Sequence, residues 1–403
     1  MGERERVRHR IAIVAVLAVA ALAFDAAFAT RHGFFDLKVY YGAINWWVHG
    51  HGELYDFIKP RSTYGFTYPP FAAVAMLPMA FVSWGVAIVI ASLMTIVATG
   101  LVVWWLVAEP DRRYKTAVIL ALLIAYEPMR ETFLFGQVNM LLVALVAGDL
   151  FFGVGLNRRW AGLGIGLATA VKLTPGLFIL YLLLTKRWRA AFVAMGTAAG
   201  ATLVTAAAAP DMAREFFTNA LWDTDRIGSL AFISNQSLQG LVARLNPEDP
   251  SKAVWLVLAV GVLVVWVVRS RRAFRAGDEA AGLAVTGVVS SLVSPVTWIH
   301  HLVWLIPSLI LLVNAGFADR AHRWRHWGVA GVGYAILCSK LVWPFDDRFS
   351  GFWGYLGSNA YVFVTLVLLF VTPIRSPHEV IAQLGVAERG PGGTPELANP
   401  VRP

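Results

Sequence analysis

One carboxylate, Asp36, lies just after the first long hydrophobic run of the chain, at the head of an aromatic-rich stretch. An ionisable side chain at a membrane boundary is costly and is therefore a functional hypothesis by default. A carboxylate in that place can act as a general base that takes a proton from a hydroxyl group. If residues 36–48 are helical, Tyr40 lies on the same helix face as Asp36. The residues alone leave a second interpretation open, in which Asp36 only caps that helix.

Lys172 is a candidate anion-binding residue, because it lies in an otherwise apolar stretch, ATAVKLTPG. A cation in such surroundings needs an anionic partner, and the phosphate group of a lipid would serve. Pro175 follows three residues later and predicts a broken helix, which favours a position beside a cavity. The alternative is a lysine near a bilayer edge whose ammonium group reaches the interface.

Two adjacent histidines, His300 and His301, lie between Trp298 and Trp304 in a second apolar segment. Histidine can bond a phosphate oxygen or a sugar hydroxyl and can carry charge near neutral pH. An interfacial belt of Trp and His with no catalytic role is the plainer alternative. No spacing of further ligand residues predicts a metal site around the two histidines.

Amide side chains supply a third group of candidates, which could bind sugar hydroxyls. Gln137 and Asn139 belong to the motif GQVN, and Asn235 and Gln236 belong to a later polar run, SNQS. The first two could equally form interhelical hydrogen bonds. Arg130 precedes GQVN and could bind a phosphate or pair with a neighbouring Glu.

Composition shows what kind of chain must position these side chains. Hydrophobic residues make up 58% of the 403 residues and charged residues 15%, whereas soluble domains carry about 25% charged residues. Residues 62–108 and 280–318 contain no Asp, Glu, Lys or Arg. We therefore expect an all-α polytopic membrane protein, because backbone exposed to lipid must satisfy its hydrogen bonds within its own segment.

The net charge of +9 does not indicate a nucleic-acid partner. The basic clusters lie between hydrophobic runs, where the preference of Lys and Arg for cytoplasmic loops explains them. The single cysteine, Cys338, cannot form an intrachain disulfide.

The basic residues also predict a topology. Residues 4–10 place the N-terminus in the cytoplasm, residues 11–29 form the first span, and residues 30–65 form an outer loop that holds Asp36. Residues 280–318 form a hairpin whose outer turn holds the two histidines. Further expected spans are 190–209, 253–268, 327–343 and 355–374, with an outer loop at 210–252.

The stretch 66–185 does not fit this scheme directly. Two spans within 66–108 would leave the basic residues near 112 outside, against the charge rule. One of the short pieces 69–82, 116–126 or 160–185 is therefore a candidate re-entrant segment. We expect about 11 to 13 transmembrane or re-entrant helices in residues 1–374, which form one catalytic domain, and a disordered cytoplasmic tail at 375–403.

Several short motifs together resemble a known family. They are Asp36 with LKVYY, GHGELYD at 50–56, FTYPPFAA at 66–73, GQVN at 136–139, VKLTP at 171–175, SNQSLQG at 234–240 and SPVTWIHH at 294–301. This set resembles glycosyltransferase family 87, the polyprenol-phosphate-mannose-dependent α-mannosyltransferases with the GT-C fold. The resemblance covers nearly the whole chain before the tail, and it is greatest to members that extend phosphatidylinositol mannosides.

The resemblance implies a reaction and a place for it. Mannose passes from polyprenyl-phosphate-mannose to a mannosylated glycolipid of the phosphatidylinositol-mannoside or lipomannan type, with inversion and an α-1,2 linkage. No metal or cofactor is needed. The enzyme lies in the plasma membrane among membrane lipids, with its active site on the extracytoplasmic side.

The resemblance also implies roles for the candidate residues. Asp36 is the general base and His300 a second catalytic side chain. Lys172, His301 and Arg130 hold the phosphate of the donor. Side chains that bind the sugar or the acceptor are Tyr40, Tyr41, Gln137, Asn139, Asn235, Gln236 and Trp298.

Two alternatives stay open at this point. The donor could carry another sugar, such as arabinose or glucose, on the same fold. The protein could also be a transporter or flippase of lipid-linked sugars, since an intramembrane lysine and broken helices fit transporters as well.

Overall fold

The protein is described here by a computed structural model that covers residues 2–28, 32–223 and 228–376. Helices make up nearly all of its secondary structure, and the described residues contain no strand beyond an isolated antiparallel bridge between Ile58 and Gly65. The expected all-α polytopic fold is therefore confirmed. Except for residues 375 and 376, the tail expected to be disordered lies outside the described residues.

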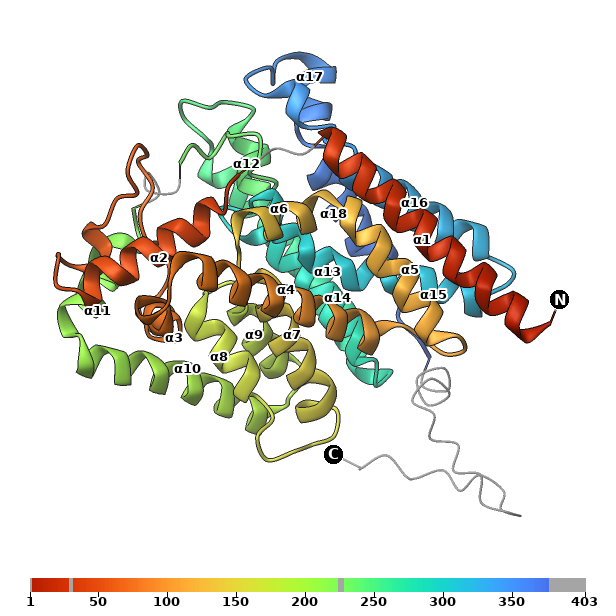
Figure 1. Cartoon of the computed structure of the whole chain (residues 1–403), viewed down its shortest axis with the longest axis horizontal. Coiled ribbons are helices and arrows are strands. Elements are labelled where there is room, and N and C mark those ends of the chain that lie inside the picture. The colour runs from red at the N-terminus through yellow and green to blue at the C-terminus, as the bar shows by residue number, and fades with distance from the viewer. Residues whose placement is uncertain (1, 29–31, 224–227, 377–403) are drawn as a thin grey trace.

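Long apolar helices form the bundle seen in Figure 1. Five stretches are long and apolar enough to cross a membrane: α1 (Glu3–Phe28), α4 (Trp84–Leu106), α10 (Trp188–Ala208), α13 (Lys252–Arg275) and Ile299–Ala318, which joins η6 (Ile299–Leu305) to α15 (Ile306–Ala318). Two bent pairs raise this to seven: α6 (Glu127–Phe135) with α7 (Asn139–Gly148) and η3 (Asp149–Val154), and α17 (Gly351–Ser358) with α18 (Ala360–Val371).

The described residues thus hold five to seven stretches of membrane-spanning length, and the expected count of 11 to 13 transmembrane or re-entrant helices stays a prediction. Shorter helices complete the bundle. They are α5 (Arg112–Ala125), α8 (Leu163–Val171), α9 (Gly176–Leu184), α14 (Glu279–Val293) and α16 (Arg323–Cys338). Helix α14 has only 15 residues and is buried along almost its whole length, as expected of a central helix that is mainly apolar.

The structure resolves the ambiguity of residues 66–108. Only α4 is a full-length helix there, because α3 (Pro70–Met76) and η2 (Leu77–Phe81) are too short to span. Arg10 near the start of α1 forms a 2.8 Å ion pair with Asp111 just before α5. The turn after α4 therefore lies at the same end of the bundle as the basic N-terminus, as the charge rule requires.

Helices α8 and α9 form a hairpin that starts and ends at one end of the bundle. Before α8, the Asp149 carboxylate accepts hydrogen bonds from the backbone N–H of Gly162 and Ile165. After α9, the Arg189 guanidinium donates to the carbonyls of Asn157 and Arg158. The segment before α8 and the segment after α9 therefore lie side by side. Nine residues of helix rise about 14 Å, roughly half of a membrane's hydrocarbon core. The predicted broken helix is thus a hairpin of two nine-residue helices with Lys172 at its turn.

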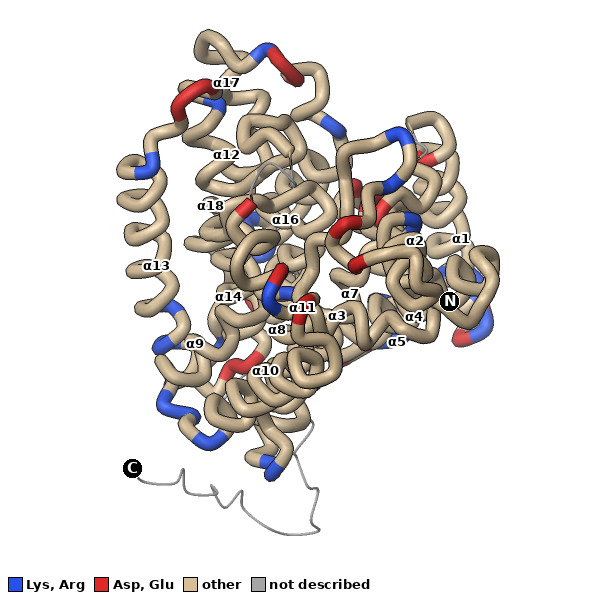
Figure 2. Tube along the Cα trace, turned by 90° about the vertical axis from the view of Figure 1, so that its left-hand side faces the viewer, with Lys and Arg blue, Asp and Glu red and all other residues tan. Residues whose placement is uncertain are grey.

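Basic side chains gather at the end of the bundle where the α8–α9 hairpin begins and ends. Figure 2 shows them at the lower end of α13 and around α9 and α10. Arg187 pairs there with Glu279 and Arg375 pairs with Asp278, which ties α9, α14 and the segment after α18 together.

A separate layer of short helices covers the opposite end, around α2 (Phe35–Val48), which is the helix expected at 36–48. It has its own hydrophobic cluster, in which Tyr55 and Phe66 are fully buried. The other short helices among the described residues are η1 (Leu54–Asp56), α11 (Pro210–Glu215), η4 (Phe216–Ala220), α12 (Leu238–Ala243) and η7 (Trp343–Phe345).

Candidate active site

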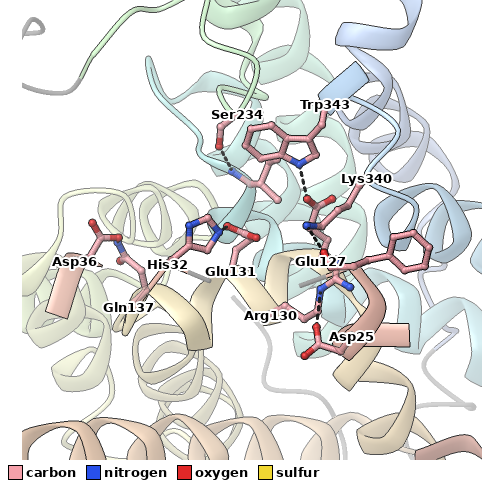
Figure 3. Close-up of polar contacts among 12 residues, drawn as sticks. Asp25, His32, Asp36, Glu127, Arg130, Glu131, Gln137, Ser234, Lys340 and Trp343 are labelled. Carbon is pink, nitrogen blue, oxygen red and sulfur yellow. Dashed lines mark hydrogen bonds and ion pairs between the residues drawn. The ribbon is translucent and has the colours of Figure 1, made fainter. Parts of the chain in front are cut away.

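Asp36 lies in the first turn of α2, where its Oδ2 accepts a 2.6 Å hydrogen bond from Nε2 of Gln137 (Figure 3). The residue that caps α2 is Phe34, so Asp36 is not the helix cap. Burial raises the pKa of the Asp36 carboxyl to about 6, although the bond from Gln137 and the nearby Lys172 act in the opposite direction. A carboxylate with this pKa is poised for general-base chemistry near neutral pH.

Gly136 brings Gln137 to this carboxylate. It ends α6 in the left-handed conformation, with φ of 72°, which turns the chain back toward α2. A Cβ atom at this position would come 2.6 Å from Cβ of Leu37. The glycine of the GQVN motif is therefore needed both for its conformation and for the close approach of α6 to α2.

A run of hydrogen bonds continues from Gln137 to two tyrosines. The Tyr68 hydroxyl donates to Oε1 of Gln137 at 2.8 Å and accepts from the Tyr40 hydroxyl at 2.9 Å. Both tyrosines are buried, and burial raises the pKa of Tyr68 well above its usual range, so its hydroxyl stays a donor. Tyr40 thus lies on the Asp36 face of α2, as predicted.

Lys172 meets the same network from the tip of the α8–α9 hairpin. Its Nζ donates to the Tyr68 hydroxyl at 3.2 Å and to Oδ1 of Asn139 at 3.0 Å, and lies 2.8 Å from Nε2 of His301. The ammonium group also lies 5.0 Å from the centroid of the Tyr68 ring. The Tyr68 hydroxyl and the Asn139 carbonyl accept hydrogen bonds from this ammonium group, so an incoming phosphate must replace one of them.

The two histidines have different environments. Nδ1 of His301 accepts from the backbone N–H of Trp298 at 3.2 Å, which directs Nε2 toward Lys172. The backbone carbonyl of His300 accepts from the side chains of Thr132 and Asn139. The His300 ring lies 4.6 Å from the His301 ring, and its Nε2 is buried with no hydrogen-bond partner in the described part of the chain. That nitrogen is available to a ligand.

The polar run SNQS holds the histidine turn in place. Oδ1 of Asn235 accepts from the Thr297 N–H at 2.9 Å, and its Nδ2 donates to Leu230 and Pro295 carbonyls. Gln236 is equally committed, since its Nε2 donates to the carbonyls of Ile233 and Ser358. Both amides are fully buried, so the structure places them behind the site and in contact with backbone.

Three further predicted residues lie away from the network of Asp36 and Lys172. Arg130 faces α1, with Nε 3.4 Å from Oδ1 of Asp25 (Figure 3). Tyr41 donates to the Val82 carbonyl at 2.9 Å. Trp298 is half-buried and packs edge-on against Phe232, 5.9 Å between ring centroids.

Three polar residues near the carboxylate are not among the predicted ones: Tyr68, His32 and Glu131. Tyr68 stands inside the motif FTYPPFAA, so its type and motif were visible in the sequence. Its role depends on contacts with Gln137 and Lys172, which are 69 and 104 residues away in the chain. Within the described residues, no group of three or more His, Cys, Asp or Glu side chains could hold a metal ion.

We predict that Tyr68→Phe lowers the activity of the protein, because the hydroxyl joins Lys172 to Gln137. Its loss removes the donor to the Gln137 carbonyl and one acceptor of Lys172, at a cost of about 1–3 kcal/mol for each buried group left unpaired. We expect a loss of activity of about tenfold or more, together with lower thermal stability. Tyr64→Phe, at an exposed tyrosine of the same loop, is the matched control and should leave both unchanged. Normal activity in Tyr68→Phe would contradict the role of the hydroxyl.

Comparisons with known proteins agree on one family. A family model described as glycosyltransferase family 87 matches residues 66–295. The chain is 34% identical over 333 residues to the polyprenol-phosphate-mannose-dependent alpha-(1-2)-phosphatidylinositol mannoside mannosyltransferase of Mycobacterium tuberculosis, which covers 76% of this chain and 75% of that protein. It is 32% identical over 385 residues to the corresponding phosphatidylinositol pentamannoside mannosyltransferase of Mycolicibacterium smegmatis, which covers 91% and 90%. No solved structure matches the chain.

Proposed function

The chain belongs to glycosyltransferase family 87, and on that basis we propose that it is a polyprenol-phosphate-mannose-dependent α-mannosyltransferase. It moves mannose onto a phosphatidylinositol mannoside and forms an α-1,2 linkage, the reaction in the names of its relatives. The observation that carries this proposal is the single network that joins a carboxylate, Asp36, to a cation, Lys172, through Gln137 and Tyr68. Transfer from a lipid phosphate needs both: a base for the acceptor and a positive charge for the leaving group.

Asp36 acts on the acceptor. A mannose 2-hydroxyl attacks the anomeric carbon of the donor, and the O–H proton passes to the Asp36 carboxylate as the new C–O bond forms. The bond from Gln137 fixes one carboxylate oxygen and leaves the other free for the hydroxyl. Attack from the face opposite the phosphate inverts the anomeric carbon.

Lys172 and His301 act on the donor. The departing polyprenyl phosphate gains negative charge as its bond to the sugar breaks, and a preorganised cation stabilises that charge. Their mutual contact shows that both side chains point to one place, and the unpaired Nε2 of His300 lies beside it. Phosphate oxygens that displace Tyr68 or Asn139 from Lys172 would complete the site.

The active site faces the extracytoplasmic side of the plasma membrane in this proposal. The basic end of the bundle supports this orientation. It holds the C-terminal end of α13 and the turn near Asp111, and the charge rule assigns it to the cytoplasm. Asp36 follows the other end of α1. Donor and acceptor would then enter from the outer leaflet.

The donor is tested by incubating membranes that contain the protein with labelled polyprenyl phosphates of mannose, arabinose and glucose. Label should enter glycolipid from the mannose donor only, and membranes that contain an Asp36→Asn variant should show none. Equal transfer of arabinose or glucose would contradict the proposed donor. Lipid-linked sugar that crosses the bilayer without new glycolipid would indicate a flippase instead.

The acceptor is tested by the glycolipid profile of a strain that lacks the gene. The phosphatidylinositol mannoside that accumulates should be one mannose shorter than the missing product. An unchanged set of phosphatidylinositol mannosides would contradict the proposed acceptor.

We predict that transfer falls as the pH drops below about 6. Burial raises the pKa of Asp36 to about 6, so the carboxyl group is protonated below that pH and cannot accept the proton of the acceptor. Activity should fall about tenfold for each further pH unit. The check is kcat/KM for the acceptor from pH 4.5 to 8, with membranes returned to neutral pH as a control for damage. A profile that stays flat down to pH 4.5 would argue against a base in this environment.

A further inference from the structure

The hydrogen bonds that position Asp36 cannot carry its proton away. Gln137 donates to the carboxylate, Tyr68 donates to Gln137 and Tyr40 donates to Tyr68. Each hydrogen in this series points toward Asp36, and an amide nitrogen does not accept a proton. After a transfer the protonated Asp36 must return to its ionised form before it can act again. Another group must take the proton.

His32 is placed to do this. It precedes α2, and its Nε2 lies 2.9 Å from Oε2 of Glu131 on α6 (Figure 3). Its ring is stacked on the Phe135 ring, 4.0 Å between centroids and 19° between planes. His32 lies four residues before Asp36 in the chain, within range of the charge of its carboxylate. The imidazole thus stacks on the Phe135 ring and has its Nε2 facing the Glu131 carboxylate, at the start of the helix that carries Asp36.

The side chain of His32 reaches solvent, whereas that of Glu131 is nearly buried. The side chain of His32 is 20% exposed, whereas that of Glu131 is 5% exposed. An imidazole side chain can both accept and release a proton. The charged or titratable groups that act on His32 come from three elements: Asp36 from α2, Glu131 from α6 and His300 from η6.

We propose that His32, held by Glu131, is the proton outlet of the site. In the transfer step the O–H bond of the acceptor breaks and an O–H bond forms on Asp36. In the next step that bond breaks, an N–H bond forms on His32, and Glu131 is the counter-ion of the imidazolium. Water then takes the proton from His32, and both side chains return to their starting states.

The proposal rests on the proposed function, since it requires that Asp36 accepts a proton in each turnover. The proposal predicts different effects on the rate of the first turnover and on the steady-state rate. His32 is not needed for the first transfer, because Asp36 starts ionised, but it is needed to prepare each later transfer. A residue that only supported the fold would change both rates together.

The test compares single-turnover and steady-state transfer from labelled polyprenyl-phosphate-mannose in membranes that contain His32→Gln. The first turnover should keep its wild-type rate, and steady-state kcat should fall about tenfold or more, at the low end of typical acid–base contributions. Added imidazole, a small diffusible proton carrier, should restore much of the steady-state rate. Glu131→Gln should lower steady-state kcat in the same sense. His51→Gln, at an exposed histidine of the loop after α2, is the matched control.

Two results would overturn the proposal. One is an equal loss of the first and later turnovers in both variants, with no effect of imidazole, which indicates a structural role. The other is a steady-state rate in His32→Gln equal to that of wild type. Wild-type membranes that form no mannosylated product would overturn the proposed function and this proposal with it, so the two failures are distinguishable.

Discussion

Asp36→Asn should reduce mannosyl transfer by about 10²–10⁴-fold, the usual contribution of a general base. Asparagine has nearly the same shape and keeps an oxygen that can accept the hydrogen bond from Gln137. What it lacks is the ability to take a proton from the acceptor hydroxyl. The loss should therefore appear in kcat, with little change in the KM of donor or acceptor. The measurement is the initial rate of glycolipid formation in membranes that hold equal amounts of each protein.

The control for this variant is another carboxylate of the same layer. Asp56 is exposed on η1, and Asp56→Asn should transfer mannose at the wild-type rate. Asp36→Ala should be as inactive as Asp36→Asn, and both should insert into the membrane normally. Undiminished turnover in either Asp36 variant would remove the general-base role.

Lys172→Met should lower kcat/KM for the lipid donor by about 10²–10³-fold, the effect of removing one group that stabilises developing charge. Methionine keeps the apolar stem at the tip of the α8–α9 hairpin and removes the ammonium group. The loss should appear in the kinetic constants for the donor, because the phosphate belongs to the donor. The KM of the acceptor should change little. Initial rates over a range of donor concentrations give both constants.

A second readout separates this role from simple damage. Lys172 acts to lower the pKa of Asp36 in the wild-type protein. Without the cation, the pKa of Asp36 should rise further above 6, and the acidic limb of the pH profile should move to higher pH. Lys38→Met, at an exposed lysine of α2, should change neither the donor kinetics nor the profile. Normal donor kinetics in Lys172→Met would contradict the phosphate role.

The placement of the amide side chains shows how far a motif can be interpreted without a structure. Gln137 and Asn139 from GQVN do reach the site, because Gly136 turns the chain toward α2. Asn235 and Gln236 carry the same amide groups, but these groups bond to backbone. Asn235 accepts from the Thr297 N–H at the histidine turn, and Gln236 donates to the Ser358 carbonyl. Both pairs of residues are Asn and Gln, and both pairs lie in short polar motifs, so the sequence does not distinguish them. The difference lies in which backbone polar groups are left unpaired nearby, and this depends on packing.

Arg130 illustrates the same limit for a charged residue. It lies on α6 beside Glu131, yet its side chain faces Asp25 on α1, whereas Glu131 faces His32. Adjacent residues of a helix point in directions about 100° apart, so one turn of α6 serves two different neighbours. The sequence placed a cation near the site but did not determine its direction.

The sequence by itself determined the membrane class, the order of the long helices and the residue types that could transfer a sugar from a lipid phosphate. These follow from local properties: apolar runs long enough for a bilayer, basic residues between them, and single charges inside them. Only the tertiary structure decided that Asp36, Tyr68, Gln137 and Lys172 form one network. The contacts join residues 69 to 104 positions apart in the chain, and no local preference encodes where the turn of the α8–α9 hairpin lies or the angle at which α6 approaches α2.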